Sequence, residues 1–138
     1  MYLVDTNVWL ERLLAQEKAD DVRRFLEAVS SDQLFISDFS FHSICVILTR
    51  LKRKQVLLDF AQDVFIDGAV NLLSVKPDET QNLIDVMDKF NLDFDDAYQY
   101  VLAEKNDLTL VSFDGDFNRT ARGRKTPAEI LSSVSDGK

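Results

Sequence analysis

The chain has 138 residues with four glycines and two prolines, and no linker, repeat or low-complexity tract divides it, so we expect a single domain over residues 1–138. Its formal net charge of −8 argues against a protein that coats nucleic acid through its overall field. One cysteine and one histidine exclude an internal disulfide and a structural zinc site of the usual ligand sets.

The first half of the chain alternates between short apolar strands and amphipathic helices. Residues 1–5 form the first predicted strand, and Thr6 and Asn7 offer capping oxygens for the helix that follows it. Further apolar periodicity predicts helices at about 19–29, 41–51 and 57–65 and strands at 34–37 and 71–75. Cys45 lies on the apolar stripe of the helix at 41–51, so we interpret it as a small core residue.

The second half continues this alternation. Pro77 and the acidic residues after it begin a helix over about 77–90, and Asp96 opens the next helix. The remaining predicted elements are a strand at 108–113, a short helix at 126–131 and a frayed polar tail at 132–138.

Near-continuous apolar strands separated by helices are typical of a parallel sheet that is covered on both faces. We therefore predict an α/β fold, a three-layer α/β/α sandwich with a central parallel sheet of four to five strands. The apolar runs are far shorter than the roughly 20 residues that span a bilayer. The start of the chain also lacks the layout of a signal peptide, so we expect a cytoplasmic protein that does not enter a membrane.

Asp5, Asp96 and Asp114 lie far apart in the sequence, but each flanks an apolar segment of a predicted strand or helix. In a parallel sheet, strand ends and helix starts share one rim, where ligands gather. Carboxylates crowded at such a rim repel one another unless cations bind, and hard oxygen ligands favour Mg²⁺ or Mn²⁺ over Zn²⁺. The sequence thus predicts a metal site formed by these aspartates, with Thr6 or Asn7 orienting a ligand, and chemistry on phosphate.

Each aspartate also has a simpler interpretation. Asp5 and Asp96 lie at helix starts, where a carboxylate caps backbone amides, and Asp114 with Gly115 is a frequent turn pair. Three independent caps or turns on one predicted rim favour the metal site over these alternatives.

Basic residues gather in two places. Residues 50–54 contain four cations that suit the C-terminal end of a helix. A second cluster follows the last predicted acids and comprises Arg119, Arg122, Arg124 and Lys125. These cations would either hold a phosphate backbone beside the metal site or remain solvated loop charges, and the sequence leaves both interpretations open.

Four segments of the chain together resemble the PIN domain. They are residues 4–7 (Val-Asp-Thr-Asn), 95–97 (Asp-Asp-Ala), 111–117 (Val-Ser-Phe-Asp-Gly-Asp-Phe) and 126–131 (Thr-Pro-Ala-Glu-Ile-Leu). The resemblance extends over essentially the whole chain, and the order and spacing of the segments support it more than any single motif does.

This resemblance implies a parallel sheet between helices and a Mg²⁺- or Mn²⁺-dependent ribonuclease. It implies that Asp5, Asp96 and Asp114 bind the metal and that Asp116 binds metal or orients water. RNA would be hydrolysed by in-line attack of a metal-activated water, leaving a 5′-phosphate. If the basic cluster holds a phosphate backbone, that backbone would be RNA. Many members are VapC-like toxins neutralised by a small antitoxin, so the implied partners are RNA, an antitoxin and a second copy of the chain.

One position departs from the PIN pattern. These domains usually place a glutamate on the helix after the second strand, six residues after a serine, and counted from Ser37 this position holds Ser43. His42 or Ser43 would then bind through water, or Asp38 would replace the glutamate, although Asp38 also suits a helix N-cap. A general-base role for His42 competes with a structural one, which we favour. The alternative function is a PIN-fold binding or regulatory module with weak or no catalysis.

Overall fold

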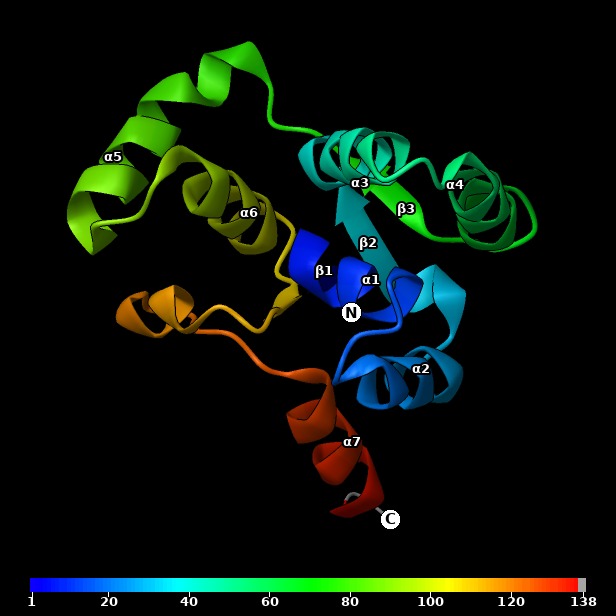
Figure 1. Ribbon diagram of the computed structural model, residues 1–138. Coiled ribbons are helices and arrows are strands. Elements are labelled where there is room, and N and C mark those ends of the chain that lie inside the picture. Colours follow the sequence, from blue (N-terminus) through cyan, green and yellow to red (C-terminus); the bar gives the residue numbers. More distant parts are fainter. Residues whose placement is uncertain (137–138) are drawn as a thin grey trace.

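Four parallel strands form the centre of the described part of the chain, which comprises residues 1–136 of this computed structural model (Figure 1). They are β1 (Tyr2–Val4), β2 (Leu34–Ser37), β3 (Asn71–Leu73) and β4 (Thr109–Val111), in the order β3-β2-β1-β4. Leu3 of β1 pairs with Phe35 on one side and with Leu110 on the other. A single parallel bridge from Lys125 to Val111 extends the outer edge of β4. The central parallel sheet is therefore confirmed.

Helices cover both faces of this sheet (Figure 1). One face packs against α1 (Thr6–Leu13), α2 (Ala19–Ala28), α3 (Asp38–Arg50), α4 (Lys54–Ala61) and α7 (Pro127–Asp136). The other face packs against α5 (Thr80–Phe90) and α6 (Phe94–Lys105). Shorter helical turns are η1 (Ser31–Gln33), η2 (Gln62–Ile66), η3 (Pro77–Glu79) and η4 (Gly115–Arg119). This arrangement is the predicted three-layer α/β/α sandwich.

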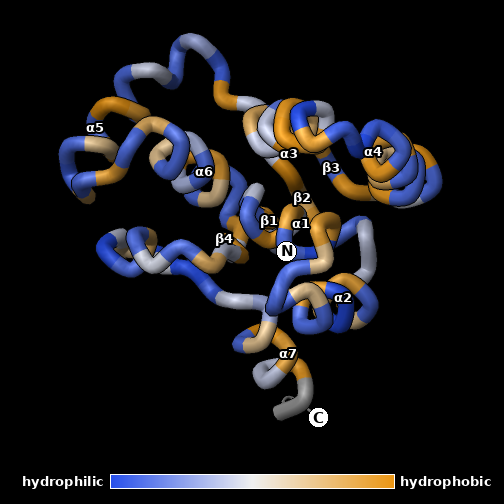
Figure 2. Tube along the Cα trace, viewed as in Figure 1, coloured by the Kyte–Doolittle hydropathy of each residue, from blue (hydrophilic) through white to orange (hydrophobic). Residues whose placement is uncertain are grey.

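Two apolar cores form because alternate residues of a strand point to opposite faces of a sheet. Leu3 and Leu110 are buried among the residues of α5 and α6, whereas Val4 and Val111 are buried on the face covered by α1 to α4 and α7. Figure 2 shows hydrophobic and hydrophilic residues alternating along the helices around the strands, as expected for helices with one buried face. Each fully buried leucine or valine stabilises the fold by about 1.5–3 kcal/mol.

Two helix caps differ from the prediction. Asp5 is the N-cap of α1, and the predicted caps Thr6 and Asn7 lie inside the helix. Ser37 is the N-cap of α3, and Asp38 is the first residue of that helix rather than its cap. The caps predicted at Thr6, Asn7 and Asp38 were wrong, because the polar residue nearest the strand end takes the cap position. The alternative interpretation of Asp5 as a helix cap is confirmed, whereas that of Asp96 was wrong, since Asp93 caps α6.

Cys45 and the last helix also differ from expectation. Cys45 is partly exposed rather than enclosed in the core, and partial burial raises the pKa of its thiol. Helix α7 continues through Asp136, beyond the end of the predicted helix at 126–131, and residues 137–138 of the predicted tail lie outside the described part. Within residues 1–136, the helices are too short or too polar to cross a membrane.

Candidate metal centre

A hollow opens at the carboxyl ends of β1 and β4, at the rim where the sequence predicts a site. Its volume is about 310 Å³, and its wall includes Asp5 after β1, Asp114 after β4 and Asp96 from the first turn of α6. The backbone amide of Asp5 donates to the carbonyl of Val111 at 2.9 Å, which ties the two strand ends together. The parallel topology thus brings the three predicted aspartates to one hollow.

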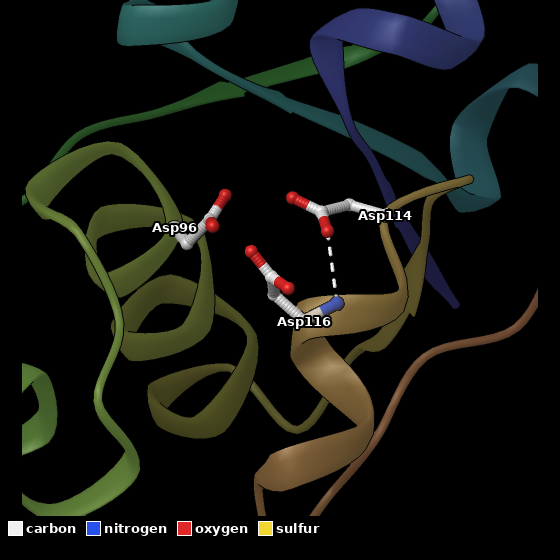
Figure 3. A group of neighbouring side chains, drawn as sticks. All are labelled: Asp96, Asp114 and Asp116. Atoms are coloured by element: carbon white, nitrogen blue, oxygen red, sulfur yellow. Dashed lines mark hydrogen bonds between the residues drawn. The ribbon is translucent and has the colours of Figure 1, made fainter.

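Asp96, Asp114 and Asp116 form a compact acidic trio at this hollow (Figure 3). One carboxylate oxygen of each lies within 4.8 Å of the others, and Figure 3 shows the side chains pointing toward one another. The Asp114 carboxylate accepts a hydrogen bond from the Asp116 amide at 2.8 Å, which fixes the turn after β4. Asp96 approaches from α6, whose N-cap Asp93 accepts a hydrogen bond from the Asp96 amide at 3.0 Å.

Burial and the neighbouring negative charges set the electrostatics of Asp96 in the acidic trio. Burial, followed by the negative charge of Asp114, raises the pKa of Asp96 from 3.8 to about 7. Carboxylates held this close favour either a proton or a bound cation over the fully ionised, empty state. Their oxygens are the ligand type that Mg²⁺ and Mn²⁺ prefer, so the residues present fit a divalent metal.

Asp5 is more deeply buried than the trio, and hydrogen-bond donors surround its carboxylate. Its Oδ1 accepts from Thr6 N at 2.8 Å and from Gln99 Nε2 at 2.9 Å, and its Oδ2 accepts from Ser112 Oγ at 2.7 Å. Burial raises the pKa of Asp5, and these hydrogen bonds oppose the rise. The predicted metal ligands are Asp5, Asp96 and Asp114. Among the described residues, the compact acidic group contains Asp116 in place of Asp5.

Thr6 and Asn7 both line the hollow, at the start of α1. Thr6 Oγ1 donates to Ser40 Oγ at 2.8 Å, and so connects α1 to α3. The Asn7 side chain braces the segment after β4, because its Nδ2 donates to Ser112 Oγ at 3.3 Å and its Oδ1 accepts from Phe113 N at 3.3 Å. In the structure both residues hold neighbouring segments in place.

The three candidates for the missing glutamate lie in different surroundings. Ser43 lines the hollow together with the aspartates. His42 is exposed and does not line it. Asp38 also lies outside the lining, where its Oδ1 accepts from the Tyr98 hydroxyl at 2.6 Å and joins α3 to α6. Burial and this hydrogen bond raise the pKa of Tyr98 to about 12. Of the three, the structure brings Ser43 alone to the site.

The order of the acids along the chain agrees with a known family. Residues 2–123 match the model of the PIN domain. The chain belongs to the PIN domain family. The resemblance seen in the sequence is thereby confirmed for most of its length. In contrast, no curated protein sequence matches this one.

Solved structures with this PIN fold include a toxin–antitoxin complex and a toxin that cleaves the sarcin–ricin loop. A toxin–antitoxin complex from Klebsiella pneumoniae has a TM-score of 0.75 at 20% identity, covering 94% of this chain and 99% of its own. VapC20 of Mycobacterium tuberculosis, a toxin that cleaves the sarcin–ricin loop, has a TM-score of 0.73 at 19% identity, covering 88% and 96%. FitAcB from Neisseria gonorrhoeae has a TM-score of 0.73 at 20% identity, covering 92% and 98%. At these identities the likeness establishes the fold.

The basic cluster of this PIN domain separates into two parts. Arg119 lies by the acidic trio, where its guanidinium donates to Asp116 Oδ1 at 3.1 Å and to the carbonyl of Asn91 at 2.7 Å. The others line a second hollow of about 330 Å³ beside β4, and they are Arg122, Arg124 and Lys125. Both arginines of this second hollow are paired, Arg122 with Asp107 at 3.0 Å and Arg124 with Glu129 at 3.2 Å.

The buried polar residues that contact Asp5 or one another beside the hollow were not foreseen from the sequence, namely Ser40, Gln99 and Ser112. With Asp5 they form a hydrogen-bonded group that we call the buried floor. The sequence held one usable signal for Gln99, which follows Asp96 by three positions and so shares its helix face. Ser112 directly follows β4. Ser40 lies in the first turn of α3, where serine is also common because its hydroxyl can bind free backbone amides.

Proposed function

We propose that this PIN domain is a metal-dependent ribonuclease, and that it is the toxin of a toxin–antitoxin pair. The observation that best supports this function is the acidic trio, which gathers three carboxylates within 4.8 Å at the carboxyl ends of parallel strands. Such an arrangement costs electrostatic free energy unless a cation neutralises it. Sites of this kind serve phosphate chemistry, because phosphate oxygens complete the coordination of hard cations.

Asp96, Asp114 and Asp116 would hold Mg²⁺ or Mn²⁺. When bound, such an ion lowers the pKa of water and neutralises the charge that develops on a reacting phosphate. The residues themselves provide orientation: the Asp116 amide holds the Asp114 carboxylate, and Arg119 holds Asp116 against the end of α5. The proposed reaction is hydrolysis of an RNA phosphodiester that leaves a 5′-phosphate.

The second hollow supplies the proposed RNA contact. Arg122, Arg124 and Lys125 place positive charge beside β4, in a chain whose net charge is −8. A localised basic surface of this kind binds a phosphate backbone without requiring an overall basic protein. Arg119 is bound to main-chain carbonyls and to Asp116, so we assign it to the acidic trio.

The proposed partners are an antitoxin and a second copy of the chain, acting in the cytoplasm. Support comes from the solved structures of this fold, which include a toxin–antitoxin complex from Klebsiella pneumoniae. A pull-down of the tagged protein co-expressed with the product of a neighbouring short reading frame tests the first partner. Light scattering of the purified chain tests the second.

One observation favours a second candidate function, a PIN-fold binding module that does not cleave RNA. Ser43 lines the hollow at the position where the resemblance implies a glutamate, so the site has one carboxylate fewer than expected. A weaker charge lowers the affinity for a divalent cation.

Cleavage of single-stranded RNA in Mn²⁺ separates the two candidates. The wild type should cleave, and a chelator should abolish cleavage. Asp96→Asn should lower the rate at least about 100-fold, because an amide is a poorer and uncharged ligand. Asp88→Asn, at an exposed aspartate on α5, is the matched control and should cleave like the wild type. Full activity of Asp96→Asn, or of the wild type in chelator, would contradict the proposed function.

A further inference from the structure

Gln99 is a buried amide in the wall of the hollow, with 2% of its surface exposed. Its Nε2 donates to Asp5 Oδ1 at 2.9 Å and to Ser40 Oγ at 2.5 Å. Its Oε1 is buried and accepts no hydrogen bond from the described residues. An unsatisfied buried carbonyl is unfavourable, so packing alone does not account for a glutamine here.

The neighbours of Gln99 on α6 emphasise this cost. Ala97, Tyr100 and Val101 are buried in the apolar core between α5, α6 and the sheet. A leucine or methionine at position 99 would fill a similar volume without burying an amide. The polar side chain is therefore explained by what its amide group holds.

The contacts of Gln99 lead to two members of the acidic trio. Asp5, which Gln99 holds through Oδ1, accepts at its other oxygen from Ser112 Oγ at 2.7 Å. The same Ser112 oxygen accepts the backbone amide of Asp114 at 2.9 Å. Asp96 lies three positions before Gln99 on the same face of α6. The buried floor thus connects the backbone of Asp114 to the helix that presents Asp96.

We propose that Gln99 is a positioning residue of the acidic site. Its amide NH₂ fixes the Asp5 carboxylate and, through Ser112, sets the position of Asp114 relative to Asp96. This inference rests on the proposed function, since it assigns Gln99 a part in the same metal site. Gln99 and Ser43 both line the hollow. The hydrogen bonds of Gln99 therefore stiffen the same wall in which Ser43 occupies the usual position of the glutamate.

Replacement of the amide by an apolar side chain of similar length tests the proposal. Gln99→Met should fold, because methionine fills the volume and removes the unsatisfied carbonyl. Its Mn²⁺ affinity, measured by calorimetry, should fall about 10-fold or more, as for other losses of groups that orient ligands. In RNA cleavage kcat should fall by a similar factor while KM stays unchanged, because the proposed RNA contacts lie elsewhere.

Gln81→Met is the matched control. Gln81 is an exposed glutamine of α5 whose Nε2 donates to Asp85 Oδ1 at 3.0 Å, so this variant loses the same kind of hydrogen bond away from the site. It should bind Mn²⁺ and cleave RNA like the wild type. If Gln99→Met fails to fold, Ser112→Ala breaks the next link of the floor and should lower Mn²⁺ affinity in the same direction.

The outcomes distinguish the two proposals. Wild-type Mn²⁺ affinity and kcat in a folded Gln99→Met protein would overturn the positioning role and leave the proposed function intact. A lowered Mn²⁺ affinity in Gln99→Met, with a wild type that cleaves no RNA, would support the positioning role and overturn the ribonuclease. Absence of Mn²⁺ binding to the wild type would overturn both.

Discussion

The acidic trio and the buried floor adjoin the same hollow, yet their carboxylates have different neighbours. In the floor, Asp5 is surrounded by donors that include Gln99 Nε2 and Ser112 Oγ. In the trio, burial and then the charge of Asp114 raise the pKa of Asp96 to about 7. Aspartate is therefore a hydrogen-bonded anchor in one region and a candidate cation ligand in the other. The role of each carboxylate is determined by its neighbours rather than by its residue type.

Alanine substitutions should separate the two regions most strongly. Asp5→Ala removes the α1 cap and leaves buried donors without an acceptor, so it should lower the free energy of unfolding by about 2 kcal/mol or more. Asp96→Ala removes a carboxylate that its neighbours repel, and in chelator it should unfold no more easily than the wild type. Chemical denaturation of both variants gives the comparison. Equal destabilisation by the two substitutions would contradict the difference between the floor and the trio.

The pH dependence of stability should report the raised pKa of Asp96. The pKa of Asp96 is raised in the folded state, so the folded protein binds a proton more tightly than the unfolded chain does. The metal-free protein should therefore lose stability as the pH rises from the ordinary value of 3.8 through about 7. Asp96→Asn should flatten this loss, and Mn²⁺ should reduce it at high pH. Thermal melts in chelator over a series of pH values measure the slope of stability against pH. A wild-type slope in Asp96→Asn would contradict the assignment of this loss to Asp96.

Much of the fold could be predicted from the sequence because its strands are short apolar runs. Each of the four predicted strands exists, and the parallel order places their carboxyl ends at one rim. The caps predicted at Thr6, Asn7 and Asp38 were wrong because several polar residues follow each strand, and backbone geometry selects among them. The extension of α7 through Asp136 was missed because its last turns are polar.

The position of the candidate site could be predicted from the sequence, but the role of each of its residues could not be predicted. The compact group contains Asp116 and leaves out Asp5, because the burial and the hydrogen-bond donors of Asp5 arise only on folding, and the ligand role of each residue stays a prediction. Gln99 was overlooked because a polar residue within a helix gives no sign of which contacts it makes. Arg119 was grouped with the other cations, although the carbonyls at the end of α5 hold it elsewhere.

A smaller effect should mark the boundary of the site. The Tyr98 hydroxyl donates to Asp38 and accepts the Val75 amide at 3.0 Å, outside the lining of the hollow. Tyr98→Phe should lower the free energy of unfolding by about 1 kcal/mol. Its Mn²⁺ affinity should stay at the wild-type value, because the trio and the floor remain intact. A clear loss of Mn²⁺ binding in calorimetry would extend the site to Asp38.

Titration calorimetry with Mn²⁺ tests the central claim most directly, because it measures the acidic trio without any RNA. The wild type and Asp88→Asn should bind Mn²⁺ in the millimolar range or more tightly, and Asp96→Asn should show no binding under the same conditions. Equal binding by Asp96→Asn and the wild type, or no binding by the wild type at millimolar Mn²⁺, would contradict the assignment of the metal site to Asp96, Asp114 and Asp116.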